Sequence, residues 1–190
     1  NNDGCTVSRS QEAKDLGIKM GVTLFQIKDI VERHNVQVLS SNYALYAEMS
    51  RRAMKILGEF VSPQEIFEYS IDESFLELTA YAANIDLTEY GHTILARLLK
   101  CLSLPACIGF GRSLTEAKLA NHIAKKNKQF NGVCNLTAID YCWTESMYQN
   151  IEVGDVWGIG RRLGNKMKDA GVYKAADLLN KPEIWVRKLM

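Results

Sequence analysis

Residues 66–78 read IFEYSIDESFLEL and carry the strongest indication of the fold. Aliphatic and aromatic residues dominate this stretch, as is typical of β-strands. Two adjacent carboxylates, Asp72 and Glu73, interrupt it. Neighbouring side chains on a straight strand point to opposite faces, so these two acids converge only if the chain turns or bulges between Ile71 and Ser74. The stretch therefore predicts a β-hairpin with both carboxylates at its tip.

Paired carboxylates of this kind suit a divalent metal. Mg²⁺ prefers oxygen ligands and usually takes one or two carboxylates together with waters and phosphates. Two such ions can hold the attacking and leaving oxygens of an in-line phosphoryl transfer. No third carboxylate stands out in the sequence as a partner for Asp72 and Glu73. An ordinary hairpin with a polar tip is the alternative, because Asp and Glu are common at exposed turns.

The rest of the chain predicts a sheet covered by helices, followed by a helical module. Apolar periodicity and capping residues predict the helices, and short apolar runs predict the strands. The predicted helices are residues 11–15, 24–33, 43–57, 86–100 and 115–126; the predicted strands are residues 36–39, 66–78, 105–110 and 132–134. After about residue 136, small helices alternate with glycine turns. The expected class is α+β.

Two basic segments follow the acidic one. Lys118, Asn121 and Lys125 have the i, i+3, i+7 spacing of one helix face, which could neutralise a polyphosphate, although a solvated face would look the same. Residues 155–163 read DVWGIGRRL, the hairpin of a helix-hairpin-helix. Its glycines would leave backbone N–H groups open to a phosphate next to the positive end of a helix. A glycine-rich corner between helices is the alternative for that segment.

Composition narrows the class of protein. The 190 residues are 47% hydrophobic and 24% charged, with a formal net charge of +1. These values argue against collagen-like, disordered and disulfide-scaffold proteins, and no run of apolar residues is long enough for a membrane span. The charge is segregated: residues 59–89 hold eight acids and no Lys or Arg, whereas residues 97–128 hold seven bases and one acid. The five scattered cysteines indicate reduced thiols in a cytoplasm.

Several longer strings occur together and in one order that is characteristic of a known family. They are NNDGC (1–5), EAK (12–14), LGIKMG (16–21), SSNY (40–43), LYA (45–47), YSIDE (69–73), AKLAN (117–121), AKK (124–126) and DVWGIGRR (155–162). On these strings the chain resembles the Y-family, lesion-bypass DNA polymerases, and within them the UmuC-type catalytic subunit of bacterial DNA polymerase V. The resemblance covers essentially the whole chain.

The resemblance implies a right-hand polymerase fragment of three parts. Residues 1–42 would be the fingers, 43–135 a ferredoxin-like palm with helices on a mixed sheet, and 136–190 a helix-hairpin-helix thumb. Asp72 and Glu73 match the family's catalytic carboxylates, which would bind two Mg²⁺ ions. The implied triphosphate-binding residues are Lys14 and Lys125, and the implied DNA-backbone-binding residues are Gly158, Gly160, Arg161 and Arg162.

The same resemblance implies an activity and partners. The activity is Mg²⁺-dependent, template-directed transfer from a dNTP to a primer 3′-hydroxyl across damaged DNA, as in SOS mutagenesis. The partners are primer-template DNA, a UmuD′ dimer and a RecA filament in the bacterial cytoplasm, with no membrane.

Family members begin with a strand that carries a first metal-binding Asp and an aromatic steric gate, and they end in a little-finger domain. Neither is found in this sequence, so we expect a fragment of a longer protein that is inactive by itself. One alternative is a non-catalytic fragment that binds the DNA backbone through the helix-hairpin-helix. Another is a different palm enzyme such as a nucleotide cyclase, which the glycine hairpin disfavours.

Overall fold

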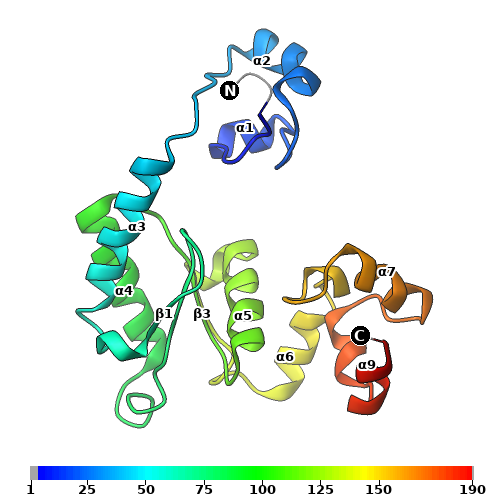
Figure 1. Cartoon of the computed structure of the whole chain (residues 1–190). Helices are drawn as coiled ribbons and strands as arrows, with labels where there is room; N and C mark the ends of the chain where they lie inside the picture. The colour runs from blue at the N-terminus through cyan, green and yellow to red at the C-terminus, as the bar shows by residue number, and fades with distance from the viewer. Residues whose placement is uncertain (1–3, 190) are drawn as a thin grey trace. The chain divides into compact units, whose positions relative to one another are not determined.

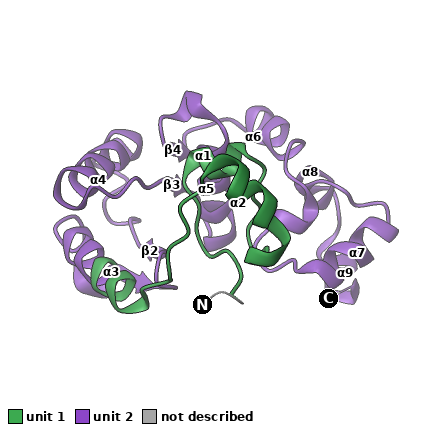
Figure 2. Cartoon of the chain, turned by 90° about the horizontal axis from the view of Figure 1, so that it is seen from above, with its two compact units in different colours: residues 1–49 green, residues 50–190 purple. Residues whose placement is uncertain are grey.

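The computed structural model describes residues 4–189. These residues form two compact units, which divide between Met49 and Ser50 (Figure 2). The first unit contains α1 (Gln11–Asp15), the 3₁₀ helix η1 (Leu24–Ile27), α2 (Lys28–His34) and the beginning of α3 (Tyr43–Leu57). The Ser10 hydroxyl caps α1 by accepting from the Ala13 amide. Residues 36–39 form no strand, so that prediction was wrong. Val38 and Leu39 are exposed there, since no neighbouring strand covers them.

The predicted hairpin is present in the second unit. It follows the 3₁₀ helix η2 (Pro63–Glu65) and consists of β1 (Ile66–Glu68) and β2 (Ser74–Leu76), which pair antiparallel with Glu68 opposite Ser74. β3 (Ile108–Phe110) and β4 (Val133–Asn135) form a second, parallel pair. The described residues thus form two two-stranded sheets, rather than the single sheet expected from the sequence.

Helices cover both sides of the strands (Figure 1). The C-terminal half of α3 packs with α4 (Leu87–Leu102) in a small core formed by Ile56, Leu57, Ile94 and Leu98, against which one residue each of β1, β2 and β3 packs. α5 (Leu114–Lys126) connects β3 to β4 and lies against β3 on the other side. A helical crossover is the usual way to join parallel strands.

A helical module follows β4 and the 3₁₀ helix η3 (Lys128–Phe130) that precedes it. It contains α6 (Tyr141–Tyr148), η4 (Val153–Asp155), α7 (Arg161–Asp169), α8 (Ala175–Leu179) and α9 (Glu183–Leu189). Its large core also contains residues of α5 and β4. The helical module and the second strand pair therefore share one core across the predicted boundary at residue 135, and the three-part division into 1–42, 43–135 and 136–190 stays a prediction.

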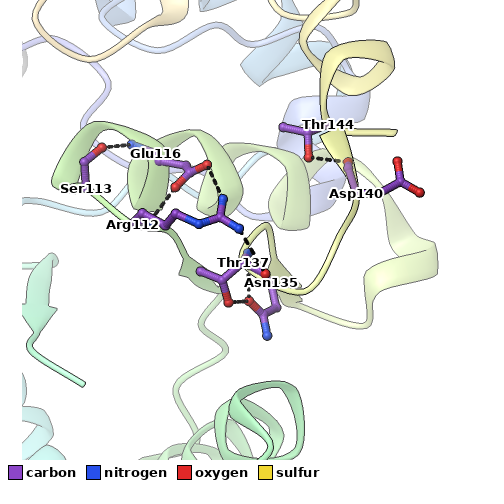
Figure 3. A network of polar contacts seen from close by, with 7 residues as sticks. All are labelled: Arg112, Ser113, Glu116, Asn135, Thr137, Asp140 and Thr144. Atoms are coloured by element: carbon purple, nitrogen blue, oxygen red, sulfur yellow. Dashed lines mark hydrogen bonds and ion pairs between the residues drawn. The ribbon is translucent and has the colours of Figure 1, made fainter. Parts of the chain in front are cut away.

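Side-chain hydrogen bonds hold the connection between β4 and the helical module (Figure 3). The Arg112 guanidinium donates to the Thr137 carbonyl at 3.2 Å, and the Thr137 hydroxyl donates to the Asn135 side-chain oxygen at 2.6 Å. Asp140 then caps α6, its side chain accepting from the Trp143 amide at 2.9 Å. These contacts fix the direction in which the chain leaves the strand pair.

Candidate functional site

The carboxylate hairpin, residues 69–73, connects β1 to β2. Its loop is closed by the backbone amides of Tyr69 and Ser70, which donate to the Glu73 carbonyl at 3.1 and 2.9 Å. The Ser70 hydroxyl donates to Asp72 at 2.8 Å. Asp72 is exposed and Glu73 is half-buried. The structure thus has both acids in the loop of a hairpin, as the sequence predicted.

A lysine from α5 meets this loop. The Lys118 ammonium lies 2.6 Å from a Glu73 carboxylate oxygen and 5.4 Å from the centre of the Tyr69 ring. The Lys118 side chain is 21% exposed and the Glu73 side chain is 38% exposed. Partial burial reduces screening by solvent, so this contact is electrostatically stronger than an exposed pair of the same length. A negative and a positive group therefore stand side by side at the site.

Glycine in β3 lets α5 approach closely enough for this contact. A Cβ added to Gly109 would lie 2.1 Å from the Asn121 amide nitrogen and 2.4 Å from the Ala117 carbonyl oxygen. Both of those atoms belong to the α5 backbone on either side of Lys118. The missing side chain at Gly109 therefore sets the position of Lys118 relative to the carboxylate hairpin.

The three predicted polar residues of α5 have different surroundings. Lys118 contacts Glu73, whereas Lys125 is exposed and lies seven residues further along the helix, roughly 10 Å away at the helical rise. The Asn121 side-chain oxygen is buried and accepts no hydrogen bond from any described residue. The periodic spacing identified this face, but only the structure singles out Lys118 within it, and the triphosphate role of Lys125 stays a prediction.

The glycine hairpin, residues 157–160, precedes α7. Gly158 has φ +89°, a conformation that favours glycine, and Gly160 is the N-cap of α7 with no side chain to occupy its amides. A Cβ at either glycine would meet no atom within 4 Å, so the backbone faces open space. Ile159, only 8% exposed, anchors the turn in the large core. Exposed backbone at a helix N-terminus can accept a phosphate, and the DNA-backbone-binding role of Gly158 and Gly160 stays a prediction.

Two arginines begin α7. Arg161 and Arg162 occupy its first two positions and are exposed.

The third predicted cationic residue lies elsewhere. Lys14 is in α1, in the other compact unit, and is also exposed. The roles that the resemblance implies for these three residues stay predictions.

Whether the carboxylate hairpin could hold a metal ion depends on which side chains can act as ligands there. The part of the chain that the structure describes contains no group of three or more His, Cys, Asp or Glu residues placed to hold an ion. Two carboxylates in one loop nevertheless fit Mg²⁺, because this ion usually takes one or two carboxylates and completes its shell with waters and substrate phosphates. Asp72 and Glu73 could therefore supply part of such a shell.

Among the described residues, no helix is long and apolar enough to cross a membrane.

Comparison with known proteins now gives the family. The model of the impB/mucB/samB family matches residues 1–122, and the chain belongs to this family. It is 44% identical to protein UmuC of Salmonella typhimurium over 189 residues, which is 99% of this chain and 44% of that protein. It is 26% identical to DNA polymerase IV of Saccharolobus solfataricus over 180 residues, 94% of this chain and 48% of the other. The resemblance to Y-family polymerases is confirmed.

Solved structures show the same fold. An insertion ternary complex of Dbh DNA polymerase superposes with a TM-score of 0.78 at 23% identity, covering 98% of this chain and 52% of that one. A Y-family DNA polymerase chimera of Dbh and Dpo4 also gives 0.78 at 22% identity, covering 100% and 52%. The α+β polymerase fold is confirmed. The chain spans less than half the length of the curated relatives it matches here.

Proposed function

We propose that this chain forms part of a lesion-bypass DNA polymerase, in which the carboxylate hairpin contributes to nucleotidyl transfer and the glycine hairpin holds the DNA backbone. The observation that carries the proposal is the 2.6 Å contact between Glu73 and Lys118 beside Asp72. It brings anionic groups suited to a metal and a cationic group suited to a phosphate to one loop. Membership of the impB/mucB/samB family supports the same function.

In the proposed reaction a primer 3′-hydroxyl attacks the α-phosphate of a dNTP and pyrophosphate leaves. Asp72 and Glu73 would hold two Mg²⁺ ions, which neutralise charge that develops on the reacting phosphate. Lys118 would neutralise charge on the triphosphate as a point charge, with Lys125 and Lys14 as further triphosphate contacts. Most of the rate enhancement in such a reaction comes from positioning and electrostatic stabilisation.

The glycine hairpin would bind the phosphate backbone of the duplex. The exposed backbone at Gly158 and Gly160, at the start of α7 and next to the exposed Arg161 and Arg162, suits phosphate groups. Binding of this kind falls steeply with salt, because each neutralised phosphate releases counterions. A UmuD′ dimer, a RecA filament and a bacterial cytoplasmic location are part of this proposal through the resemblance alone.

Primer extension tests the catalytic role. In the longer protein that contains this chain, Asp72→Asn and Glu73→Gln should each lower the extension rate by orders of magnitude, because each removes a charged ligand from a cooperative site. Asp86→Asn, at the cap of α4, is the matched control and should keep activity. Extension at the wild-type rate in both carboxylate variants would remove the metal assignment.

A non-catalytic DNA-binding role for the isolated chain is the second candidate, and the exposed glycine hairpin on its large core favours it. Residues 1–190 should then shift duplex DNA in a gel without Mg²⁺, with an affinity that falls with salt, and should extend no primer. Arg161→Gln with Arg162→Gln should weaken the shift, whereas Arg187→Gln, in α9, should not.

A further inference from the structure

A hydrogen bond connects the two hairpins. The Trp157 indole nitrogen donates to the Tyr69 hydroxyl at 3.1 Å, across 88 residues of sequence. Trp157 is the first residue of the glycine hairpin, and Tyr69 is the first residue of the carboxylate hairpin. Both belong to the second compact unit. The segments proposed to bind DNA and metal are therefore in direct contact.

Ring packing strengthens this connection. The Tyr69 and Trp157 rings lie 5.5 Å apart at an interplanar angle of 86°, and the Phe75 ring of β2 lies 5.8 Å from Trp157 and 5.7 Å from Tyr69. Two of these pairs, Tyr69 with Trp157 and Tyr69 with Phe75, are edge-to-face, an arrangement that adds to the stabilisation from burial alone. The three rings thus form one cluster, which we call the aromatic bridge: Tyr69, Phe75 and Trp157.

Each end of the aromatic bridge is tied to a functional loop. At one end, Val156 and Ile159 on either side of the turn are buried in the large core, so Trp157 is carried by the backbone that presents Gly158 and Gly160. At the other end, the Tyr69 amide donates to the Glu73 carbonyl at 3.1 Å, and the Tyr69 ring lies beneath the Lys118 ammonium. A displacement of one loop would therefore also displace the other.

We propose that Tyr69 and Trp157 are positioning residues through which the binding of duplex DNA at the glycine hairpin and of divalent metal at the carboxylate hairpin reinforce each other. This inference rests on the proposed function. The physical reason is the shared contact: a ligand that binds one loop better when the aromatic bridge is formed favours the formed bridge, and with it the arrangement of the other loop. By linkage, the factor by which metal tightens DNA binding equals the factor by which DNA tightens metal binding.

Fluorescence anisotropy of a labelled primer-template duplex, titrated with the full chain, measures this factor. Dissociation constants with saturating Mg²⁺ and with EDTA are compared at constant ionic strength, because Mg²⁺ also competes for phosphates. We expect Mg²⁺ to tighten binding about fivefold in the wild type, the lower end of common coupling factors. Tyr69→Phe and Trp157→Phe each keep a ring and lose the hydrogen bond, and each should bring the factor close to one. Combining the two substitutions should lower it no further.

The matched controls make the same Tyr→Phe and Trp→Phe substitutions at residues outside the aromatic bridge. Tyr141→Phe and Trp143→Phe alter exposed residues of α6, 62% and 63% exposed, and should keep the wild-type factor. A bridge variant that also loses metal-free DNA binding would show a merely structural role and overturn the proposal. A bridge variant that keeps the full Mg²⁺ effect would overturn it as well.

Absence of any Mg²⁺ effect in the wild type would also overturn the coupling, and a second measurement then separates this result from failure of the proposed function. Titration of the chain with Mn²⁺, followed by electron paramagnetic resonance, reports the metal site directly. Mn²⁺ binding that is lost in Glu73→Gln would leave the metal assignment standing without the coupling. If neither the wild type nor Glu73→Gln binds Mn²⁺, the metal assignment and the coupling are both overturned.

Discussion

The regions beneath the two hairpins differ in how much core supports them. Among residues 4–189, the large core beneath the glycine hairpin contains fifteen buried residues, whereas the small core between α3 and α4 contains four. The glycine hairpin thus belongs to a well-packed module, whereas the carboxylate hairpin connects two short strands of three residues each. α5 belongs to the large core and also reaches the carboxylate hairpin. The comparison teaches that the carboxylate hairpin, which has little core of its own, takes support from the helical module through α5 and the aromatic bridge.

The largest expected effect tests the large core. Met167 is fully buried in it, and Met167→Ala should lower the free energy of unfolding by about 2–5 kcal/mol through lost burial and the cavity left behind. Urea denaturation followed by circular dichroism measures this. Leu179→Ala, at a residue 46% exposed, is the control and should cost less than about 1 kcal/mol. Equal costs at the two sites would contradict the assignment of Met167 to the core.

The next effect tests how α5 joins the two regions. Gly109→Ala puts a Cβ against the α5 backbone at 2.1 Å, so the helix or the strand must shift, at a cost of about 1–3 kcal/mol. The shift should also separate Lys118 from Glu73 and weaken Mn²⁺-dependent nucleotide binding. Gly154→Ala is the control, since its added Cβ meets no atom within 4 Å. Wild-type stability in Gly109→Ala would show that α5 does not depend on this close approach.

A smaller effect tests the electrostatics of the carboxylate hairpin. Lys118→Met removes the ammonium that now neutralises Glu73, so in the absence of nucleotide the carboxylates should bind Mn²⁺ more tightly, by about 1 kcal/mol or roughly fivefold. Mn²⁺ titration by electron paramagnetic resonance measures the change. Lys125→Met, further along α5, should leave the affinity within about twofold because screening weakens more distant charges. Weaker metal binding in Lys118→Met would contradict the pairing.

The smallest effect tests an exposed ion-pair network on the helical module. Hydrogen bonds from Lys174 and then from Lys168 lower the pKa of Glu152 below its ordinary value. A carboxyl with a lowered pKa in the folded state contributes stability above its unfolded pKa, and loses that contribution as the pH falls through the folded pKa. Glu152→Gln should therefore lower the melting temperature slightly at pH 7, and this difference should shrink as the pH falls below the ordinary pKa of a glutamate. A difference that persists in acid would show that the effect is not electrostatic.

Local patterns predicted most of the elements. The helices Gln11–Asp15 and Tyr43–Leu57 were predicted with their bounds, and the hairpin at β1 and β2 followed from the apolar run around two acids. The glycine turn before α7 was also predicted. The strand at residues 36–39 was wrong, because a β-rich sequence becomes a strand only when a partner pairs with it.

The sequence alone determined the family, the hairpin with Asp72 and Glu73 and the glycine turn, because these depend on residues close together in the chain. The tertiary structure alone decided that Lys118 meets Glu73, that Gly109 admits α5, and that Trp157 donates to Tyr69. These contacts join residues 8 to 88 positions apart on different elements, and no local period or turn preference encodes such pairings. They depend on how α5 and the large core pack against the strands, which only the folded chain establishes.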